Sequence, residues 1–193
     1  MRDEDIDTTE ISEQTNFSRR ESGKYYDLEA RQYDVRAIAN WCLDKAESNG
    51  FHPTSMWINK IVYFIYETAL QNFKIVLTPA KIEAWDHGPV FRELYAQFQS
   101  DTPFHRLKKM NFRTRQREDA REDFKELDLK IFDSAWKKYG HLSAAELRRI
   151  SHRSGSPWDI AWHTGGKSNP GMGIDIGVIL GRNSYPDDGK QRN

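Results

Sequence analysis

Cysteine is almost absent from this chain of 193 residues, in which Cys42 is the only one. A single cysteine excludes a disulfide framework and a zinc site built from several thiolates. Long hydrophobic runs are also missing: no stretch of about 18 apolar residues exists, so no membrane span is expected. The polar, acidic N-terminus lacks the apolar core of a signal peptide. These absences predict a soluble protein of a reducing compartment, the cytoplasm.

An excess of charge of one sign is missing too, because 29 Lys and Arg balance 29 Asp and Glu. Balanced charge argues against nucleic acid as the main partner, although a local patch could still bind it. The segment 105–121 is such a patch, with seven Lys or Arg against Glu118 and Asp119. Its low apolar content is typical of a solvated loop or surface helix, and contact with a phosphate backbone is the functional alternative.

Sequence signatures of nucleophilic or nucleotide chemistry are scarce. No GxSxG elbow or P-loop is present, and Gly-Gly-Lys-Ser at 165–168 lacks the first glycine and the preceding strand of a P-loop. Ser151 with His152, or Ser156 with His163, could supply a nucleophile and a base. Helix capping accounts better for both serines, so no catalytic residue is predicted.

The histidines do not form a metal-binding pattern. His141, His152 and His163 recur every eleven residues, which would align them on one helix. Gly155 and Pro157 interrupt that helix, and a zinc site needs three or four convergent ligands. The sequence therefore predicts neither a metal site nor a cofactor.

The most informative segment that is present is 82–90, with the sequence Ile-Glu-Ala-Trp-Asp-His-Gly-Pro-Val. Glycine tolerates a positive φ at Gly88, and proline suits the first turn of a helix. The segment predicts a short extended run, a tight turn and then a helix over about 89–99. Such a turn could hold a catalytic site, or it could be a rigid support that displays Trp85 and His87 to a partner protein.

Helical periodicity predicts three longer helices, over about 34–49, 55–71 and 125–139. Asp34 and Thr54 are suited to cap the first two. The apolar residues of the second helix cover most of its circumference, which indicates a central, buried helix.

Two short helices are expected near the end of the chain. Ser143 and Glu146 have the spacing of a capping box, in which each side chain bonds the backbone N–H of the other residue. Ser156 and Pro157 repeat the logic, with serine as the cap and proline at the first helical position.

The expected fold is mainly α: a compact single domain of about six helices, with at most a short two- or three-stranded β element near residues 75–86. The expected domain organisation has three parts. Residues 1–33 form an N-terminal tail that is disordered or binds a partner, residues 34–165 form the helical domain with the basic insert at 105–121, and residues 166–193 form a partly frayed extension.

Several segments, in order, resemble the SocA-like, phage-associated family of Panacea-domain antitoxins. The segment 82–90 resembles the motif I-E-A-W-x-x-G-P-V, the most specific element. The other matching segments are Ala39-Asn40-Trp41, Asn59-Lys60-Ile61-Val62-Tyr63-Phe64, Leu94-Tyr95 with Phe98, Tyr139-Gly140, Leu142-Ser143, Glu146-Leu147, Ser151-His152 and Ser156-Pro157-Trp158. The stretches 57–59 and 67–70 depart from the pattern, and the tail and the insert are less typical.

The resemblance implies a mostly helical fold and an antitoxin that neutralises a toxin by direct protein binding, with no enzyme activity of its own. The toxins of the family include translation inhibitors related to alarmone synthetases. The partner would be the toxin, in a hetero-oligomeric complex or together with a homo-oligomer. The candidate toxin-binding residues are Tyr25, Tyr26, Tyr63, Trp85, His87, Tyr95 and Trp158. The residues expected to shape the motif are Gly88, Pro89, Ser143, Glu146, Ser156 and Pro157.

Two other functions stay open. A DNA-binding regulator of its own operon would use the basic insert and the helix-turn-helix-like stretch 140–153, where Arg148, Arg149 and Arg153 could contact phosphates. A hydrolase would use His87 or His152.

Overall fold

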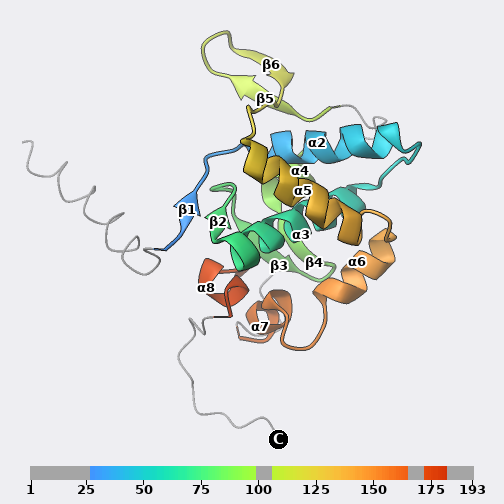
Figure 1. The fold of residues 1–193 in the computed structure, drawn as a ribbon, viewed down its shortest axis with the longest axis vertical. Coiled ribbons are helices and arrows are strands. Elements are labelled where there is room, and N and C mark those ends of the chain that lie inside the picture. Colours follow the sequence, from blue (N-terminus) through green and yellow to red (C-terminus); the bar gives the residue numbers. More distant parts are fainter. Residues whose placement is uncertain (1–26, 99–105, 165–171, 182–193) are drawn as a thin grey trace, which may run out of the picture.

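The computed structural model describes residues 27–98, 106–164 and 172–181 (Figure 1). Within these residues the chain forms seven helices and seven short strands, and the strands pair in three sheets. The prediction of a mainly α fold is therefore wrong, and the domain is α/β. The short β element expected near 75–86 contains two of these strands, Ile75–Val76 and Ile82–Trp85. The other strands escaped prediction because each spans only two to four residues, which is too short for a period-two pattern to emerge.

Helix α3 (Ser55–Phe73) is the centre of the domain, as its apolar circumference predicted. The Thr54 side chain accepts a hydrogen bond from the backbone N–H of Trp57 and so caps the helix. Its buried residues are Trp57, Ile58, Asn59, Lys60, Ile61, Val62, Tyr63, Phe64, Ile65, Tyr66, Ala69 and Leu70. Burial of each large apolar side chain stabilises the fold by roughly 1.5–3 kcal/mol.

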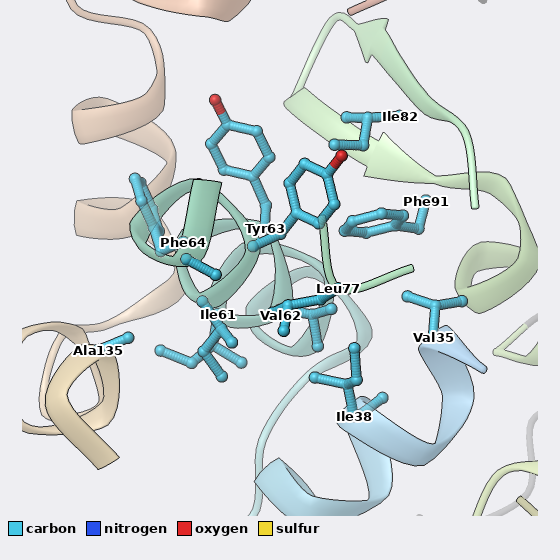
Figure 2. Packing of buried hydrophobic residues seen from close by; sticks show 14 of the residues in the cluster. Val35, Ile38, Ile61, Val62, Tyr63, Phe64, Leu77, Ile82, Phe91 and Ala135 are labelled. Atoms are coloured by element: carbon cyan, nitrogen blue, oxygen red, sulfur yellow. The ribbon is translucent and has the colours of Figure 1, made fainter. Parts of the chain in front are cut away.

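Three further helices pack around α3: α2 (Val35–Ser48), α5 (Glu126–Tyr139) and α6 (Ala144–Ser151). Figure 2 shows Val35 and Ile38 of α2 and Ala135 of α5 pointing at the α3 residues from different sides. Asp34 caps α2 by accepting from the backbone N–H of Arg36.

The segment 82–90 forms a hairpin of β3 (Ile82–Trp85) and β4 (Gly88–Phe91), and β7 (Met172–Gly173) pairs with the other edge of β3. The prediction that a helix begins at Pro89 is therefore wrong, because Pro89 lies in β4 and α4 spans only Arg92–Gln97. Pro89 has no N–H to donate, and it is tolerated because β4 is an edge strand.

The basic insert is a second hairpin, β5 (Lys108–Asn111) paired with β6 (Gln116–Asp119), rather than a loop or helix. It projects from the helices in Figure 1. Polar side chains on both strands hid the pattern, because no face of the hairpin is covered by the core.

The chain ahead of α2 joins the domain. Strand β1 (Glu29–Ala30) pairs in parallel with β2 (Ile75–Val76). Arg31 then reaches the buried carboxylate of Asp128, with Nε 2.7 Å from Oδ2, and Tyr33 Oη donates to the same oxygen at 2.7 Å.

Two short helices complete the fold: α7 (Pro157–Thr164) and α8 (Ile176–Ile179). Ile174, Val178 and Ile179 are buried, so the chain around α8 docks on the domain. None of the helices in the described ranges is long and apolar enough to cross a membrane.

Candidate functional site

The turn between β3 and β4 is the point where α3 and α6 converge on the hairpin. Gly88 has a φ of +101°, which disfavours any other residue. A Cβ at this position would lie 2.8 Å from Ser151 Oγ, 2.9 Å from Lys60 Cε and 3.0 Å from His152 Cε1. Glycine is therefore required here for two reasons, its backbone conformation and the closeness of its neighbours.

Lys60 supports the turn from inside the core. Its Nζ donates to the Pro89 carbonyl oxygen at 2.8 Å, and the side chain is 1% exposed. Burial, reinforced by the positive charge of Arg148, lowers the pKa of Lys60 from 10.5 to about 7. The neighbouring Asn59 accepts from the backbone N–H of Phe91 at 3.1 Å, so two successive polar residues of α3 hold β4 in place.

Helix α6 holds the turn from the other side through the carbonyl oxygen of Asp86. His152 Nε2 lies 3.1 Å from this oxygen, while Nδ1 lies 2.7 Å from the carbonyl oxygen of Arg148. A neutral imidazole can donate only one of these bonds, and the imidazolium can donate both. Arg148 Nη2 adds a longer contact of 3.4 Å to Asp86.

A chain of aromatic contacts fixes Trp85. The Trp158 indole N–H donates to the carbonyl oxygen of Trp85 at 2.7 Å, and the Trp85 indole N–H donates to Glu83 Oε2 at 2.8 Å. The ring of Tyr95 meets the Trp85 ring edge-on, with centroids 4.7 Å apart. Arg92 pairs with the other oxygen of Glu83 at 3.2 Å. The indole of Trp85 is therefore held by Glu83 at its N–H and by the Tyr95 ring through the edge-on contact.

The outer side of this turn presents a mixed surface, which we call the turn surface: Trp85, Asp86, His87, Arg92 and Tyr95. The side chains of Asp86 and His87 are 81% and 64% exposed. Tyr95 is 41% exposed, and Trp85 is half-buried. Rigid aromatic rings beside mobile charged groups are the composition of a protein-binding surface.

The predicted toxin-binding residues differ in how deeply they are buried. The rings of Trp85 and Tyr95 are in contact on the turn surface, and the exposed His87 lies in the same turn. Tyr63 is buried in α3 and donates to Glu67 at 2.8 Å, and burial raises its pKa. Trp158 is also buried, so both residues can act on a partner only by supporting the surface. Tyr25 and Tyr26 lie outside the described residues.

The residues proposed to shape the motif do so by capping and turn geometry. Ser143 and Glu146 form a reciprocal capping box at α6. The Ser156 hydroxyl accepts from the backbone N–H of Asp159, and Pro157 is the first residue of α7. The Ser151 hydroxyl donates to the Arg148 carbonyl oxygen at 2.8 Å, and its Oγ also lies 3.2 Å from His152 Nδ1. Both groups contact the same Arg148 carbonyl oxygen and Ser151 is buried, so the pair stabilises the end of α6 rather than presenting a nucleophile to a substrate.

Sequence reasoning missed the supporting roles of Lys60, Asn59 and Arg148. The signal was available for the first two, because adjacent polar residues inside an otherwise apolar helix need buried partners. Within the described residues no group of three His, Cys, Asp or Glu side chains converges as metal ligands would. The arrangement at the turn is suited to recognition.

Comparison with known proteins agrees with this geometry. The family model described as "Antitoxin SocA-like, Panacea domain" matches residues 58–159, a little over half of the chain, including the whole β3–β4 hairpin. The chain is 29% identical over 154 residues to the protein named Antitoxin SocA of Caulobacter vibrioides (strain NA1000 / CB15N), which covers 74% of this chain and 77% of that relative. No solved structure matches the chain.

Proposed function

This chain belongs to the SocA-like antitoxin family with a Panacea domain, and on this premise we propose that it neutralises a cognate toxin by binding it directly. The toxin is a protein encoded by the neighbouring gene, and we propose an inhibitor of translation related to alarmone synthetases. Binding takes place in the cytoplasm and requires no chemistry by the antitoxin itself.

The observation that carries this proposal is the rigid support beneath the turn surface. Lys60 and Arg148 direct donors at backbone carbonyl oxygens of the turn, and His152 Nε2 lies 3.1 Å from the carbonyl oxygen of Asp86. A surface held in one conformation before binding loses little entropy when a partner docks, and this favours affinity. Trp85 and Tyr95 then act as aromatic anchors, and the exposed His87 adds a polar contact from the same turn.

Co-expression with the toxin tests the proposal. Growth should be restored by the wild-type protein and lost again when His87 and Trp85 are replaced as His87→Ala and Trp85→Phe. His141→Ala is the matched control, because His141 is also exposed but lies at the far end of α5. If the toxin still stops growth while the wild-type protein accumulates to a higher level than the toxin, the proposal fails.

DNA binding is the second candidate function, and the basic β5–β6 hairpin is the observation that favours it. A two-stranded ribbon can enter the major groove of DNA. The helix-turn-helix-like stretch supports it less well, because Arg148 is turned inward to Asp86. A promoter fragment whose retention falls steeply with salt would support this role.

A further inference from the structure

The β5–β6 hairpin is a projecting arm with a fixed base. Asn40 of α2 donates to the carbonyl oxygens of Leu107 and Ala120, at 2.9 and 2.8 Å, and accepts from the backbone N–H of Leu107 at 2.7 Å. Leu107 and Ala120 are buried, so the two ends of the arm are part of the core. An isolated two-stranded hairpin is marginally stable at best, and this anchor is what maintains the arm.

Beyond its base the arm is exposed to solvent, and some of its exposed side chains are apolar. Phe112 at the tip is 90% exposed, and Met110 is 44% exposed. Every residue from 112 to 118 is exposed. A phenylalanine this accessible contributes little to the fold, because its burial stabilises the chain only when a second surface covers it.

The charges of the arm are only partly used within the domain. Arg106 pairs with Asp44, Lys109 with Glu122 and Arg121 with Asp119. In the part of the chain that the structure describes, no ion pair involves Lys108, Arg113, Arg115 or Arg117. These four cations surround Phe112 and Met110 in sequence.

Arg115 holds an unusual backbone conformation in the tip. Its φ of +56° lies in the left-handed region, where glycine and asparagine are favoured. A long cationic side chain therefore occupies a position whose backbone conformation glycine would adopt at lower energy.

We propose that this arm is a second toxin-binding element, which inserts Phe112 into an apolar pocket rimmed by carboxylates on the toxin. The inference rests on the proposed function and assigns part of its specificity. The turn surface supplies the rigid aromatic contact, and the arm adds a second contact from an element that lies ahead of α5 in the chain.

A protein partner fits the arm better than nucleic acid does. The register pairs Lys108 with Asp119 and Lys109 with Glu118, so each face of the ribbon carries a carboxylate beside its lysine. A carboxylate on each face repels a continuous phosphate backbone. An exposed apolar side chain with separate cations close to it in sequence instead complements an apolar pocket with an acidic rim.

Titration of the purified product of the neighbouring gene with matched variants tests the inference. Phe112→Ser should weaken binding at least about ten-fold, as expected of an aromatic anchor. Phe73→Ser is its control, because Phe73 is 45% exposed at the end of α3, and it should leave the affinity unchanged. The double variant Arg113→Glu/Arg117→Glu should weaken binding, and most strongly at low salt. The control double variant Lys130→Glu/Lys137→Glu on α5 makes the same change in net charge and should leave the affinity unchanged.

Arg115→Gly separates binding from folding. Glycine relieves the left-handed backbone, so the midpoint of thermal unfolding should stay the same or rise while the affinity for the toxin falls. A loss of affinity accompanied by a lower midpoint would contradict the role assigned to this side chain.

The outcomes are distinguishable from failure of the proposed function. If the wild-type protein does not bind the toxin, the antitoxin mechanism fails and the arm's role fails with it. If the wild-type protein binds and all the arm variants bind equally well, only the inference about the arm is overturned. If these variants lose retention of promoter DNA but keep their affinity for the toxin, the arm binds nucleic acid and the inference is likewise overturned.

Discussion

The Nζ of Lys60 donates to the carbonyl oxygen of Pro89 at 2.8 Å from a site that is almost closed to solvent. The motif of the β3–β4 turn is therefore bound to the central helix through the buried amine of Lys60. This pairing joins two segments 29 residues apart, and it explains why a lysine occurs among the apolar residues of α3.

The first prediction concerns the pH dependence of stability. Burial lowers the pKa of Lys60 to about 7 in the folded protein, against 10.5 for an ordinary lysine. Between these pH values the unfolded chain retains a proton that the folded protein has released, so the contribution of Lys60 to the free energy of unfolding becomes more favourable as pH rises. The change is on the order of a few kcal/mol.

Urea denaturation of the wild type and Lys60→Met between pH 6 and pH 10 measures this effect. Methionine keeps most of the apolar stem and removes the titrating amine. The free energy of unfolding of Lys60→Met, relative to that of the wild type, should be highest at pH 6 and lowest at pH 10. A difference between the two proteins that is constant with pH would contradict the linkage.

Gly88→Ala should destabilise the domain by about 2 kcal/mol or more, because it adds a steric clash to an unfavourable φ. Gly155→Ala is the matched control. Gly155 also has a positive φ, +75°, but an added Cβ there would meet nothing within 4 Å. It should cost roughly 1 kcal/mol, the price of the backbone conformation alone. Equal losses in chemical denaturation would mean that the close approach at Gly88 is unimportant.

Removal of the carboxylate of Asp128 should loosen the chain ahead of α2. Asp128→Asn leaves the buried Arg31 guanidinium paired only with the exposed carboxylate of Glu29, and loss of a buried charged partner costs about 3–5 kcal/mol. Asp133 on the same helix pairs with Lys45 in a mostly exposed site. Asp133→Asn should therefore cost less than about 1 kcal/mol. Thermal unfolding of both variants compares the two pairs, and a similar shift for both would refute the importance assigned to burial.

Replacement of Asn40 should release the arm without unfolding the core. Asn40→Ala removes all three hydrogen bonds at the base of the β5–β6 hairpin. Amide hydrogen exchange in residues 107–120 should then speed up while exchange in α3 remains slow. Protection of the hairpin equal to that in the wild type would show that Asn40 is not its anchor.

Sequence reasoning identified the helices best where a strong signal was local. Thr54 and the apolar circumference of 55–71 were enough to place α3, and Asp34 was enough to start α2. Strands outside the expected element at 75–86 were missed because their stability comes from pairing partners distant in sequence, as when Glu29 pairs with Ile75. Local propensity cannot report such partners.

The candidate site was found in sequence, but its support was not. The segment 82–90 stands out by composition, and the family resemblance picked it out independently. The donors that hold it come from Lys60 and His152, which lie outside the segment and meet it only in the folded chain. Buried Tyr63 and Trp158 could not be told apart from surface residues, because aromatic side chains serve cores and interfaces equally well.

The central claim is neutralisation by direct binding, and calorimetric titration of the purified toxin into the purified antitoxin tests it most directly. The account predicts a saturable complex whose affinity falls at least about ten-fold with Trp85→Phe and His87→Ala together, while His141→Ala binds as the wild type does. If the wild-type proteins form no complex in vitro although the antitoxin suppresses toxicity in cells, the direct-binding account is contradicted.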